Sequence, residues 1–315
     1  MLKTTFLNNV LNQYKIKPYL VLLFLIIFSS TTFSETKLVI LGSGTPNPDP
    51  NRFGSGYAII VNEKAYIVDF GPGIVRRISA MSPSWGGKFS AMELENINIA
   101  FLTHIHSDHS GALADLILTP WVMGRDEPLK LFGPQGLKKM AKKITEAYED
   151  DINYRLYGSQ PANKLGYLTN VSEIFDDGLI YKDDNVEVIA FKNSHGDLED
   201  SFGYLFETND KKILFSGDTA VSENLKKYGK NLDILVHEVF SSETFENKTK
   251  EWQIYHKAHH TSSIDLGKIA NELKPNKLVL SHILFWGASS ESLLSDISQN
   301  FNGTSIIAED LLVID

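Results

Sequence analysis

The sequence has no cysteine among its 315 residues. This absence excludes disulfide bonds, thiolate metal ligands, a cysteine nucleophile and a lipid anchor attached through cysteine. Basic residues are also few, with 30 Lys and Arg against 39 Asp and Glu. Any metal ion must therefore be held by imidazole and carboxylate groups, and the acidic surface repels nucleic acid at long range.

No apolar run reaches the roughly 20 residues that a membrane-spanning helix needs. The run "YLVLLFLIIF" at residues 19–28 follows three lysines and precedes small polar residues, which is the order of a secretory signal. We expect residues 1–34 to be a signal peptide and the mature protein, with a net charge of −12, to be periplasmic or secreted without stable membrane insertion. The alternative is an uncleaved N-terminal membrane anchor.

Strands and helices alternate along the rest of the chain. Apolar, β-rich runs that indicate strands begin at residues 37, 57, 65, 97, 185, 202, 211, 233 and 277. Helical periodicity predicts helices over residues 73–81, 111–122, 136–151 and 262–274. This order predicts a layered α/β body with helices outside, and because no linker interrupts it, residues 35–315 are expected to form a single domain.

The glycine-rich stretch "GSGTPNPDPNRFGSG" at residues 42–56 raises the question of a nucleotide-binding loop. Such a loop needs a helix directly after its glycines, so that the helix N-terminus faces the phosphate. Pro46, Pro48 and Pro50 prevent a helix from beginning there. The stretch is therefore not expected to bind a nucleotide in that way.

Metal-ligating residues are concentrated in "FLTHIHSDHSG". A buried strand leads into a loop that carries His104, His106, Asp108 and His109, and imidazole and carboxylate are ligands for Zn²⁺ and similar ions.

Three further groups follow apolar strands in the same manner, namely His195, Asp218 and His282. Because layered α/β folds gather functional loops at the carboxyl ends of their strands, we expect these side chains to join the first cluster.

The segment "THIHSDHSG" resembles the H-x-H-x-D-H signature of the metallo-β-lactamase-fold hydrolases. The likeness extends over residues 37–315 through "GSGT", "VDFGPG", "SFGY", "SGDT" and "LVLSH". It implies a four-layer αββα sandwich with two divalent metal ions, most often Zn²⁺, at one edge. The motif match implies His104, His106 and His195 as ligands of the first ion, Asp108, His109 and His282 as ligands of the second, and Asp218 as a bridge.

Two metal ions that share a water molecule lower its pKa toward about 7, which provides a hydroxide nucleophile at neutral pH. The leaving oxygen still needs a proton. The stretches "LVHEVF" and "KAHHTSS" resemble motifs of the phosphodiesterase branch of the family, which includes tRNase Z. By that match His259 is the general acid and Glu238 orients it, while His256 and His260 remain alternatives for the residue that faces the site.

The expected function is that of a hydrolase that cleaves a small sulfate ester, as the related arylsulfatases do, or a phosphodiester. The alternative is a 3′-tRNA processing endoribonuclease of the tRNase Z type. An acidic exported protein without a Gly- and Arg-rich arm argues against nucleic acid as substrate. A lactonase and a non-catalytic metal-binding protein are further alternatives, and a homodimer is considered for the assembly.

The loop at residues 42–56 then serves substrate binding in this interpretation. In tRNase Z the corresponding loop has a P-x-K-x-R-N pattern, and aligning Pro48 with its proline keeps Arg52 but puts Pro50 and Phe53 in place of lysine and asparagine. Arg52 and Phe53 are therefore predicted to bind a substrate smaller than tRNA, with an aromatic part. A proline-stiffened turn with a solvated Arg52 is the alternative.

Overall fold

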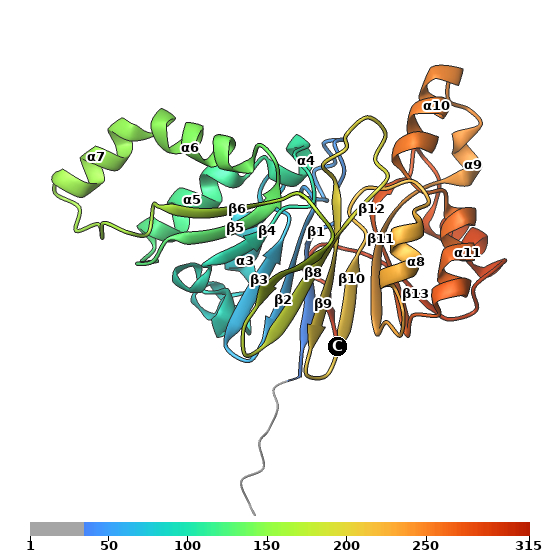
Figure 1. Cartoon of the computed structure of the whole chain (residues 1–315), viewed down its shortest axis with the longest axis horizontal. Helices are drawn as coiled ribbons and strands as arrows, with labels where there is room; N and C mark the ends of the chain where they lie inside the picture. Colours follow the sequence, from blue (N-terminus) through green and yellow to red (C-terminus); the bar gives the residue numbers. More distant parts are fainter. Residues whose placement is uncertain (1–34) are drawn as a thin grey trace, which may run out of the picture. The chain divides into compact units, whose positions relative to one another are not determined.

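Two seven-stranded sheets lie face to face in the computed structural model, which describes residues 35–315 (Figure 1). The first sheet has the order β14-β1-β2-β3-β4-β5-β6. Its strands are β1 (Lys37–Gly42), β2 (Gly56–Val61), β3 (Lys64–Val68), β4 (Ile99–Phe101), β5 (Leu129–Pro134), β6 (Thr169–Ile174) and β14 (Val313–Ile314). The second sheet has the order β13-β12-β11-β10-β9-β8-β7. Its strands are β7 (Gly178–Lys182), β8 (Val186–Lys192), β9 (Phe202–Thr208), β10 (Lys212–Phe215), β11 (Ile234–Phe240), β12 (Lys277–Leu284) and β13 (Thr304–Ile307).

Helices cover the outer face of each sheet. Those packed on the first sheet are α3 (Ile74–Met81), α5 (Leu113–Val122), α6 (Leu137–Ala147) and α7 (Glu149–Tyr157). Those on the second sheet are α8 (Glu223–Tyr228), α11 (Ser263–Leu273) and α12 (Ser290–Ser298). The remaining helices are α4 (Ser107–Ser110), α9 (Ser242–Phe245), α10 (Lys250–His259) and the 3₁₀ turns η1 (Pro83–Trp85), η2 (Ser90–Met92) and η3 (Leu94–Asn96).

The core is continuous through all four layers because the central strands are buried on both faces. In β1, Leu38 and Ile40 point between the sheets, whereas Val39 and Leu41 pack under the helices. Alternate side chains of a strand point to opposite faces, so a run of four apolar residues satisfies both interfaces at once. The predicted four-layer αββα sandwich is thereby confirmed.

All nine predicted strands are present, as β1–β4 and β8–β12. Five others were not predicted, because β5–β7, β13 and β14 are polar, short or partly exposed. The prediction of one helix over residues 136–151 is wrong, since the chain leaves the helical conformation at Tyr148 and begins α7 at Glu149. A polar pattern that continues across a break of one residue looks like a single helix.

Residues Glu35–Asp315 form one compact unit. The predicted signal peptide, residues 1–34, lies outside the described residues. In the part of the chain that the structure describes, no helix has the length and apolar character needed to cross a membrane.

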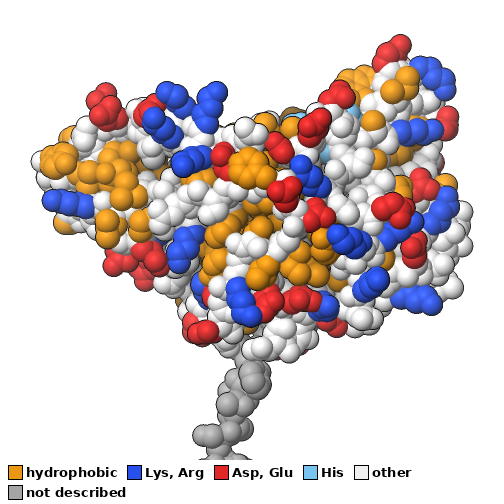
Figure 2. Space-filling model, viewed as in Figure 1, with side chains coloured by type: hydrophobic (Ala, Val, Ile, Leu, Met, Phe, Trp, Pro, Cys, Tyr) orange, Lys and Arg blue, Asp and Glu red, His pale blue; other side chains and the backbone are white. Residues whose placement is uncertain are grey.

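The parallel strands determine where functional groups collect. Strands β3 to β6 run parallel in the first sheet, and β10 to β13 run parallel in the second. The carboxyl ends of both sets lie at the upper edge in Figure 1, beside α4 and below α10. We call this the carboxyl edge, and the pale blue imidazoles seen at the top of Figure 2 belong to it.

Candidate metal centre

All seven predicted metal ligands meet at the carboxyl edge, although they come from four separate segments. They fall into four groups whose ligand atoms lie within 4.8 Å of one another: His104, His106 and His195; His104, His109 and Asp218; Asp108, His109 and His282; and Asp218 and His282 with His260. Six of the seven side chains are buried, and His106 is half-buried. The roles of these residues as ligands stay predictions.

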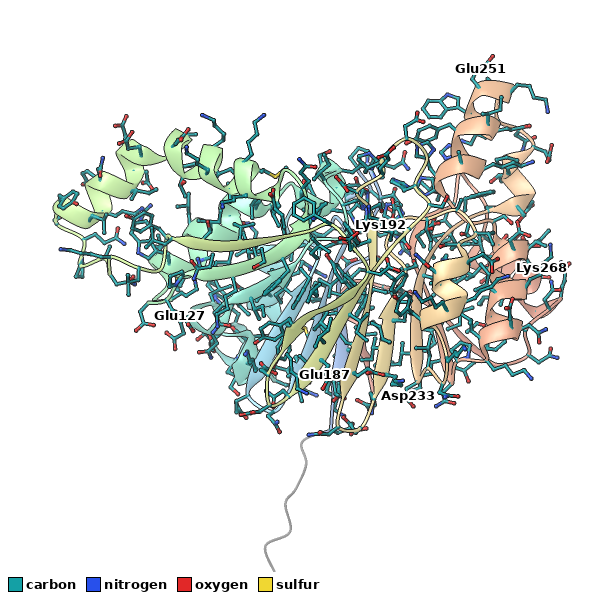
Figure 3. The ribbon with its side chains drawn as sticks, viewed as in Figure 1. Glu127, Glu187, Lys192, Asp233, Glu251 and Lys268 are labelled. Carbon is teal, nitrogen blue, oxygen red and sulfur yellow. The ribbon has the colours of Figure 1, made fainter. Side chains whose placement is uncertain are left out.

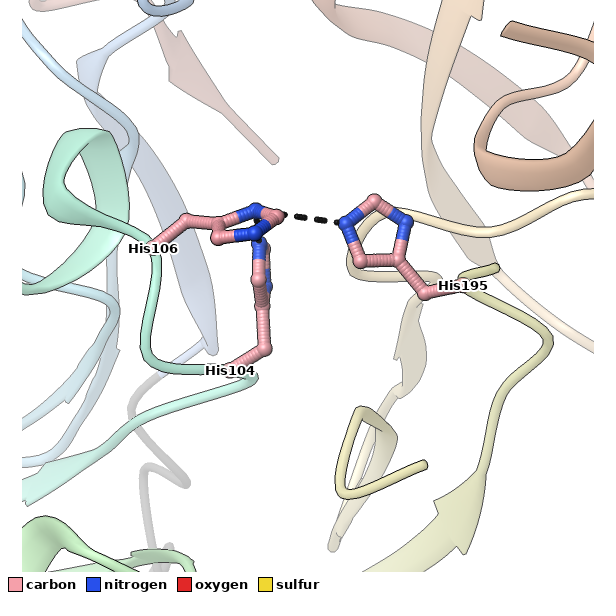
Figure 4. A group of neighbouring side chains, drawn as sticks. All are labelled: His104, His106 and His195. Carbon is pink, nitrogen blue, oxygen red and sulfur yellow. Dashed lines mark hydrogen bonds between the residues drawn. The ribbon is translucent and has the colours of Figure 1, made fainter. Parts of the chain in front are cut away.

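The first group consists of three imidazoles that converge on one point (Figure 4). His106 Nδ1 lies 3.0 Å from Nε2 of His104 and 3.3 Å from Nε2 of His195. Two nitrogen ligands of one tetrahedral metal ion, each at about 2.0–2.1 Å from it, lie about 3.3 Å apart. The spacing of this group therefore fits a shared divalent ion.

The other groups add carboxylate oxygens. Asp108 Oδ2 is 3.4 Å from His109 Nε2 and 3.0 Å from His282 Nε2. Asp218 lies between His109 and His104, with Oδ1 3.4 Å from His109 Nε2 and Oδ2 3.8 Å from His104 Nε2. This position suits the bridging role that was predicted for Asp218.

The charges at this edge favour a cation. Burial lowers the pKa of His109, but the carboxylates of Asp218, Asp108 and Asp69 outweigh burial and hold that pKa well above its usual value. His109 Nε2 and Asp218 Oδ1 are buried and have no hydrogen-bond partner among the described residues. Buried polar atoms without partners are costly, so both the charge and these atoms fit a bound divalent metal.

Hydrogen bonds behind the imidazoles fix which nitrogen faces the centre. His109 Nδ1 donates to Asp69 Oδ2 at 2.7 Å, and His195 Nδ1 donates to the carbonyl oxygen of His259 at 2.8 Å. His104 Nδ1 lies 3.0 Å from Thr103 Oγ1, whose own proton is directed to Asp69. Each ring is therefore held in the tautomer that leaves Nε2 available as a ligand.

Asp69 was not predicted as a site residue, although it lies in the quoted "VDFGPG". It is 1% exposed, has a left-handed backbone with φ of 57°, and also accepts the main-chain N–H of Thr103 at 2.8 Å. The signal in the sequence was a carboxylate directly after an apolar strand, as for Asp218. The next turn is tightly packed, because a Cβ on Gly71 would come within 2.0 Å of the Asp108 carbonyl oxygen.

His282 reaches the centre through an irregularity in β12. The pairing of β11 with β12 shifts after Glu238, which lies opposite Ser281, so His282 is an extra residue in its strand. Its φ of 45° is rare for a residue with a side chain. Such bulges occur beside active sites, where they redirect a side chain, and strain of this kind persists only where the surroundings enforce it.

The structure places His260, and not the predicted His259, against Glu238. Glu238 Oε2 lies 3.2 Å from Nδ1 of His260, which is 8% exposed, and Glu238 Oε1 accepts the N–H of Thr261 at 2.7 Å. His259 is half-buried, donates from Nδ1 to the Tyr255 carbonyl oxygen and stacks on the Tyr255 ring. His259 ends α10, whereas His260 is extended, and this change of backbone sends the two rings in different directions.

Arg52 and Phe53 line a cavity of about 550 Å³ that also includes Asp108. The Arg52 guanidinium is engaged within the protein, where it donates to Ser43 Oγ and to the Ala308 carbonyl oxygen, both at 2.9 Å. The Phe53 ring lies under the guanidinium of Arg77. Both residues thus border the carboxyl edge, and their role in substrate binding stays a prediction.

Comparison with known proteins gives the family. The model of the family described as "Anti-Pycsar protein Apyc1" matches residues 36–282. The chain belongs to this family. It is similar to ribonuclease Z of Mycobacterium bovis, with 26% identity over 257 residues that cover 78% of this chain and 85% of the relative.

Three solved structures share the fold. The metallo-β-lactamase-fold protein YhfI of Bacillus subtilis has a TM-score of 0.69 and 18% identity, covering 90% of this chain and 100% of its own. The short form of human tRNase Z has a TM-score of 0.65 and 21% identity, covering 89% and 98%. Zn²⁺-bound PqqB of Methylobacterium extorquens has a TM-score of 0.60 and 19% identity, covering 89% and 99%.

These findings confirm the predicted membership of the metallo-β-lactamase-fold hydrolases and the predicted metal-dependent hydrolysis of ester bonds. This protein is thus a metallo-hydrolase of the metallo-β-lactamase fold, with a cluster of histidine and aspartate side chains at one sheet edge.

Proposed function

We propose that this protein is a phosphodiesterase of the ribonuclease Z type that uses two divalent metal ions, and that these ions are Zn²⁺. The observation that carries the proposal is the position of the Glu238–His260 pair, which places His260 Nδ1 3.9 Å from Asp218 Oδ2 at the edge of the metal centre. A proton donor beside a metal centre is what the departure of an alkoxide requires.

The comparisons favour a phosphodiester over a sulfate ester as substrate. The curated relatives reported above are ribonuclease Z proteins, so they support the tRNase Z-like alternative better than the arylsulfatase-like interpretation. They also weigh weakly against the expectation that nucleic acid is not a substrate. The net charge and the internally engaged Arg52 keep a small phosphodiester as the second candidate.

Divalent ions at this centre would acidify a water molecule and stabilise the negative charge that develops on the phosphoryl oxygens. His104, His106 and His195 would hold one ion, Asp108, His109 and His282 the other, and Asp218 would join both. The hydrogen bonds that His109 donates to Asp69 and His195 donates to the His259 carbonyl oxygen hold these two imidazoles in orientation.

Glu238 and His260 can supply the proton for the leaving oxygen. Burial raises the pKa of the Glu238 carboxyl well above its usual value and lowers that of His260 to about 4. The Glu238 carboxyl lies 3.2 Å from Nδ1 of His260, so a proton can pass between the two groups. A proton that His260 gives to the leaving oxygen from its other nitrogen can be replaced from Glu238, so the pair ends as carboxylate and neutral ring.

The experiment combines metal analysis with hydrolysis. The metal-loaded full chain and the variants His260→Ala, His259→Ala and His104→Ala are assayed on bis(p-nitrophenyl) phosphate, p-nitrophenyl sulfate and precursor tRNA. We expect two metal ions per chain and cleavage of a phosphodiester but not of the sulfate ester. His104→Ala should lose metal and activity together.

The adjacent histidines make a matched pair. We expect His260→Ala to lose about 10²–10⁴-fold in kcat while keeping its metal, as loss of general acid catalysis does, and His259→Ala to keep both metal and rate. Loss of metal in His260→Ala would make His260 a ligand instead of the donor. Cleavage of none of the three substrates by a fully loaded protein would refute the proposal.

We also propose that the protein is exported, because residues 1–34 have the order of a secretory signal. A C-terminally tagged full chain should be recovered from the periplasm or medium, with an N-terminus that begins after Ser34. An intact N-terminus in the membrane fraction would support the anchored alternative. Sedimentation of the same mature protein tests the predicted homodimer.

A further inference from the structure

Two buried tyrosine hydroxyls connect the two sheets beneath the carboxyl edge. Tyr57 belongs to β2 in the first sheet, and its hydroxyl donates to Ser281 Oγ in β12 of the second sheet at 2.9 Å. Tyr204 belongs to β9 in the second sheet, and its hydroxyl donates to the carbonyl oxygen of Leu102, just after β4 of the first sheet, at 2.5 Å. We call these residues the two cross-sheet tyrosines.

Each of these hydrogen bonds ends next to a predicted metal ligand. Ser281 directly precedes His282, which is predicted to bind the second ion. Leu102 precedes His104 by two residues, and His104 is predicted to bind the first ion. Each predicted ion thus has one ligand whose segment is tied to the opposite sheet by a tyrosine hydroxyl.

Packing of the rings does not explain the two hydroxyls. Tyr57 is 6% exposed, Tyr204 is fully buried, and both rings belong to the apolar core between the sheets. Burial raises the pKa of Tyr57 to about 12 and that of Tyr204 well above its usual value, so both groups stay protonated and can donate. A phenylalanine would fill the same space without a polar atom that needs a partner.

The segments at which the bonds end have an irregular backbone. His282 has a φ of 45° in the bulge of β12. His104 lies beyond the last residue of β4, which ends at Phe101. Strained backbone persists only where its surroundings enforce it. A fixed hydrogen bond beside each ligand keeps that ligand in place before a metal ion binds, so less free energy is spent on ordering the site when the ion arrives.

Tyr57 also lies close to the predicted ligands of the second ion. It lines a small cavity of about 10 Å³ together with His109, Asp218 and His282. Its hydroxyl accepts a further hydrogen bond from Ser55 Oγ at 3.4 Å, so its position is fixed from both sheets. The Tyr57 side chain therefore supports this part of the centre from below.

We infer that the two cross-sheet tyrosines are positioning residues for the metal ions, each for a different ion. Tyr57 holds the segment of His282 and supports the second ion. Tyr204 holds the segment of His104 and supports the first ion. The inference rests on the proposed two-metal function and deepens it, because it assigns the two ions separate supports in the core between the sheets.

Phenylalanine variants test the inference, because they remove the hydroxyl and keep the ring. One buried hydrogen bond corresponds to about 3- to 10-fold in an equilibrium constant. We therefore expect Tyr57→Phe to weaken binding of the second ion by about 3- to 10-fold and to leave the first within about twofold, and Tyr204→Phe to do the reverse.

Tyr66→Phe is the matched control. Tyr66 is fully buried in the same core, but its hydroxyl donates at 2.8 Å to Asp183, which lies in the turn before β8. The control loses a buried hydrogen bond as the two test variants do, so it shows what reduced stability alone does to metal affinity. We expect it to bind both ions as the wild type does.

Competition between the full chain and a chromogenic chelator for Co²⁺ gives the two affinities, and the visible spectrum of bound Co²⁺ shows which ion binds at each step. His195→Ala and His282→Ala, each of which lacks a predicted ligand of one ion only, supply the reference spectra. Ser281→Ala removes the acceptor of Tyr57, so it should reproduce Tyr57→Phe. The double variant should bind no more weakly than either single variant.

Weakening of the same ion by Tyr57→Phe and Tyr204→Phe, or affinities in both that equal those of Tyr66→Phe, would overturn the inference. Additive losses in Tyr57→Phe and Ser281→Ala would overturn the assignment of Tyr57. The proposed function is tested separately, because two bound ions with the expected selectivity but no phosphodiester cleavage would refute only that function. A wild type that binds fewer than two ions would refute both.

Discussion

Replacing Asp69 by Asn tests how the metal centre is organised. The change puts an NH₂ group in place of one carboxylate oxygen, so it removes the charge and keeps the shape of the side chain. The carboxylate accepts hydrogen bonds from the Thr103 N–H at 2.8 Å, from Thr103 Oγ1 at 3.0 Å and from His109 Nδ1 at 2.7 Å. Asn tolerates the left-handed backbone that this position has, with φ of 57°. Asp69→Asn therefore preserves the turn and removes one acceptor.

The expected magnitude follows from the tautomer of His109. An amide that keeps its oxygen toward Thr103 presents its NH₂ group to His109 Nδ1, so Nδ1 must become the acceptor and the ring proton moves to Nε2. The protonated Nε2 can no longer ligate a metal ion. Loss of a partner that orients a ligand costs about 10- to 100-fold in metal affinity, or about 1.4–2.7 kcal/mol.

Competition with a chromogenic chelator measures this change, and mass spectrometry of the metal gives the stoichiometry. Asp183→Asn is the control, because Asp183 also accepts several hydrogen bonds but lies away from the metal centre. It stands in the turn before β8, next to the Glu187 end of that strand, whereas Lys192 marks the other end (Figure 3). We expect the control to bind metal as the wild type does. Folded Asp69→Asn with an affinity within twofold of the wild type would refute the reasoning.

Three further outcomes follow from buried or paired groups. Lys64 and two tyrosine hydroxyls hold the pKa of Asp183 below its usual value despite partial burial. The ionised carboxylate therefore stabilises the folded protein above pH 4, and this stabilisation is lost as the pH falls further. In denaturant unfolding, Asp183→Asn should have a free energy of unfolding about 2 kcal/mol lower than the wild type at pH 7, with a smaller difference at pH 3. Gly71→Ala should lower both metal content and melting temperature, because the added Cβ displaces the Asp108 loop; unchanged metal content would contradict this. Arg125→Met should lower the free energy of unfolding, measured in urea, by at least about 3 kcal/mol, because the buried guanidinium donates to four carbonyl groups that would lose this donor. A decrease below about 1 kcal/mol, on the order of a single exposed contact, would refute this expectation.

The sequence predicts which histidine and aspartate side chains come together, because much of the cluster is local in the chain. His104, His106, Asp108 and His109 lie within six residues, and a strand that ends just before them defines the edge at which they stand. The side chains that orient them are harder to predict. Asp69 acts through one hydrogen bond to a residue 40 positions away, and nothing in "VDFGPG" distinguishes that role from an ordinary turn.

The choice between two adjacent histidines shows where prediction from sequence ends. His259 and His260 differ by one position, and their roles depend on where α10 stops. A shift of that end by one residue would exchange the ring that meets Glu238 for the ring that stacks on Tyr255. Helix ends are the least certain feature of a sequence-based assignment, so the sequence predicts that a histidine meets Glu238 but not which of the two does so.

Helix α10 itself has a pattern that hides its function. Trp252, Tyr255 and His256 recur at the spacing of an ordinary buried helix face, and such a face usually packs into a core. Here Trp252 remains 54% exposed, and Trp286, the ring that packs beside His256, comes from a segment 30 positions after His256 in the chain. The same spacing thus occurs in buried helix faces and in exposed aromatic faces, and only the tertiary structure distinguishes the two. Helix α10 ends directly before His260, and its aromatic residues line the same cavity as His282, one of the predicted metal ligands, so a pattern typical of a core face stands beside the metal centre.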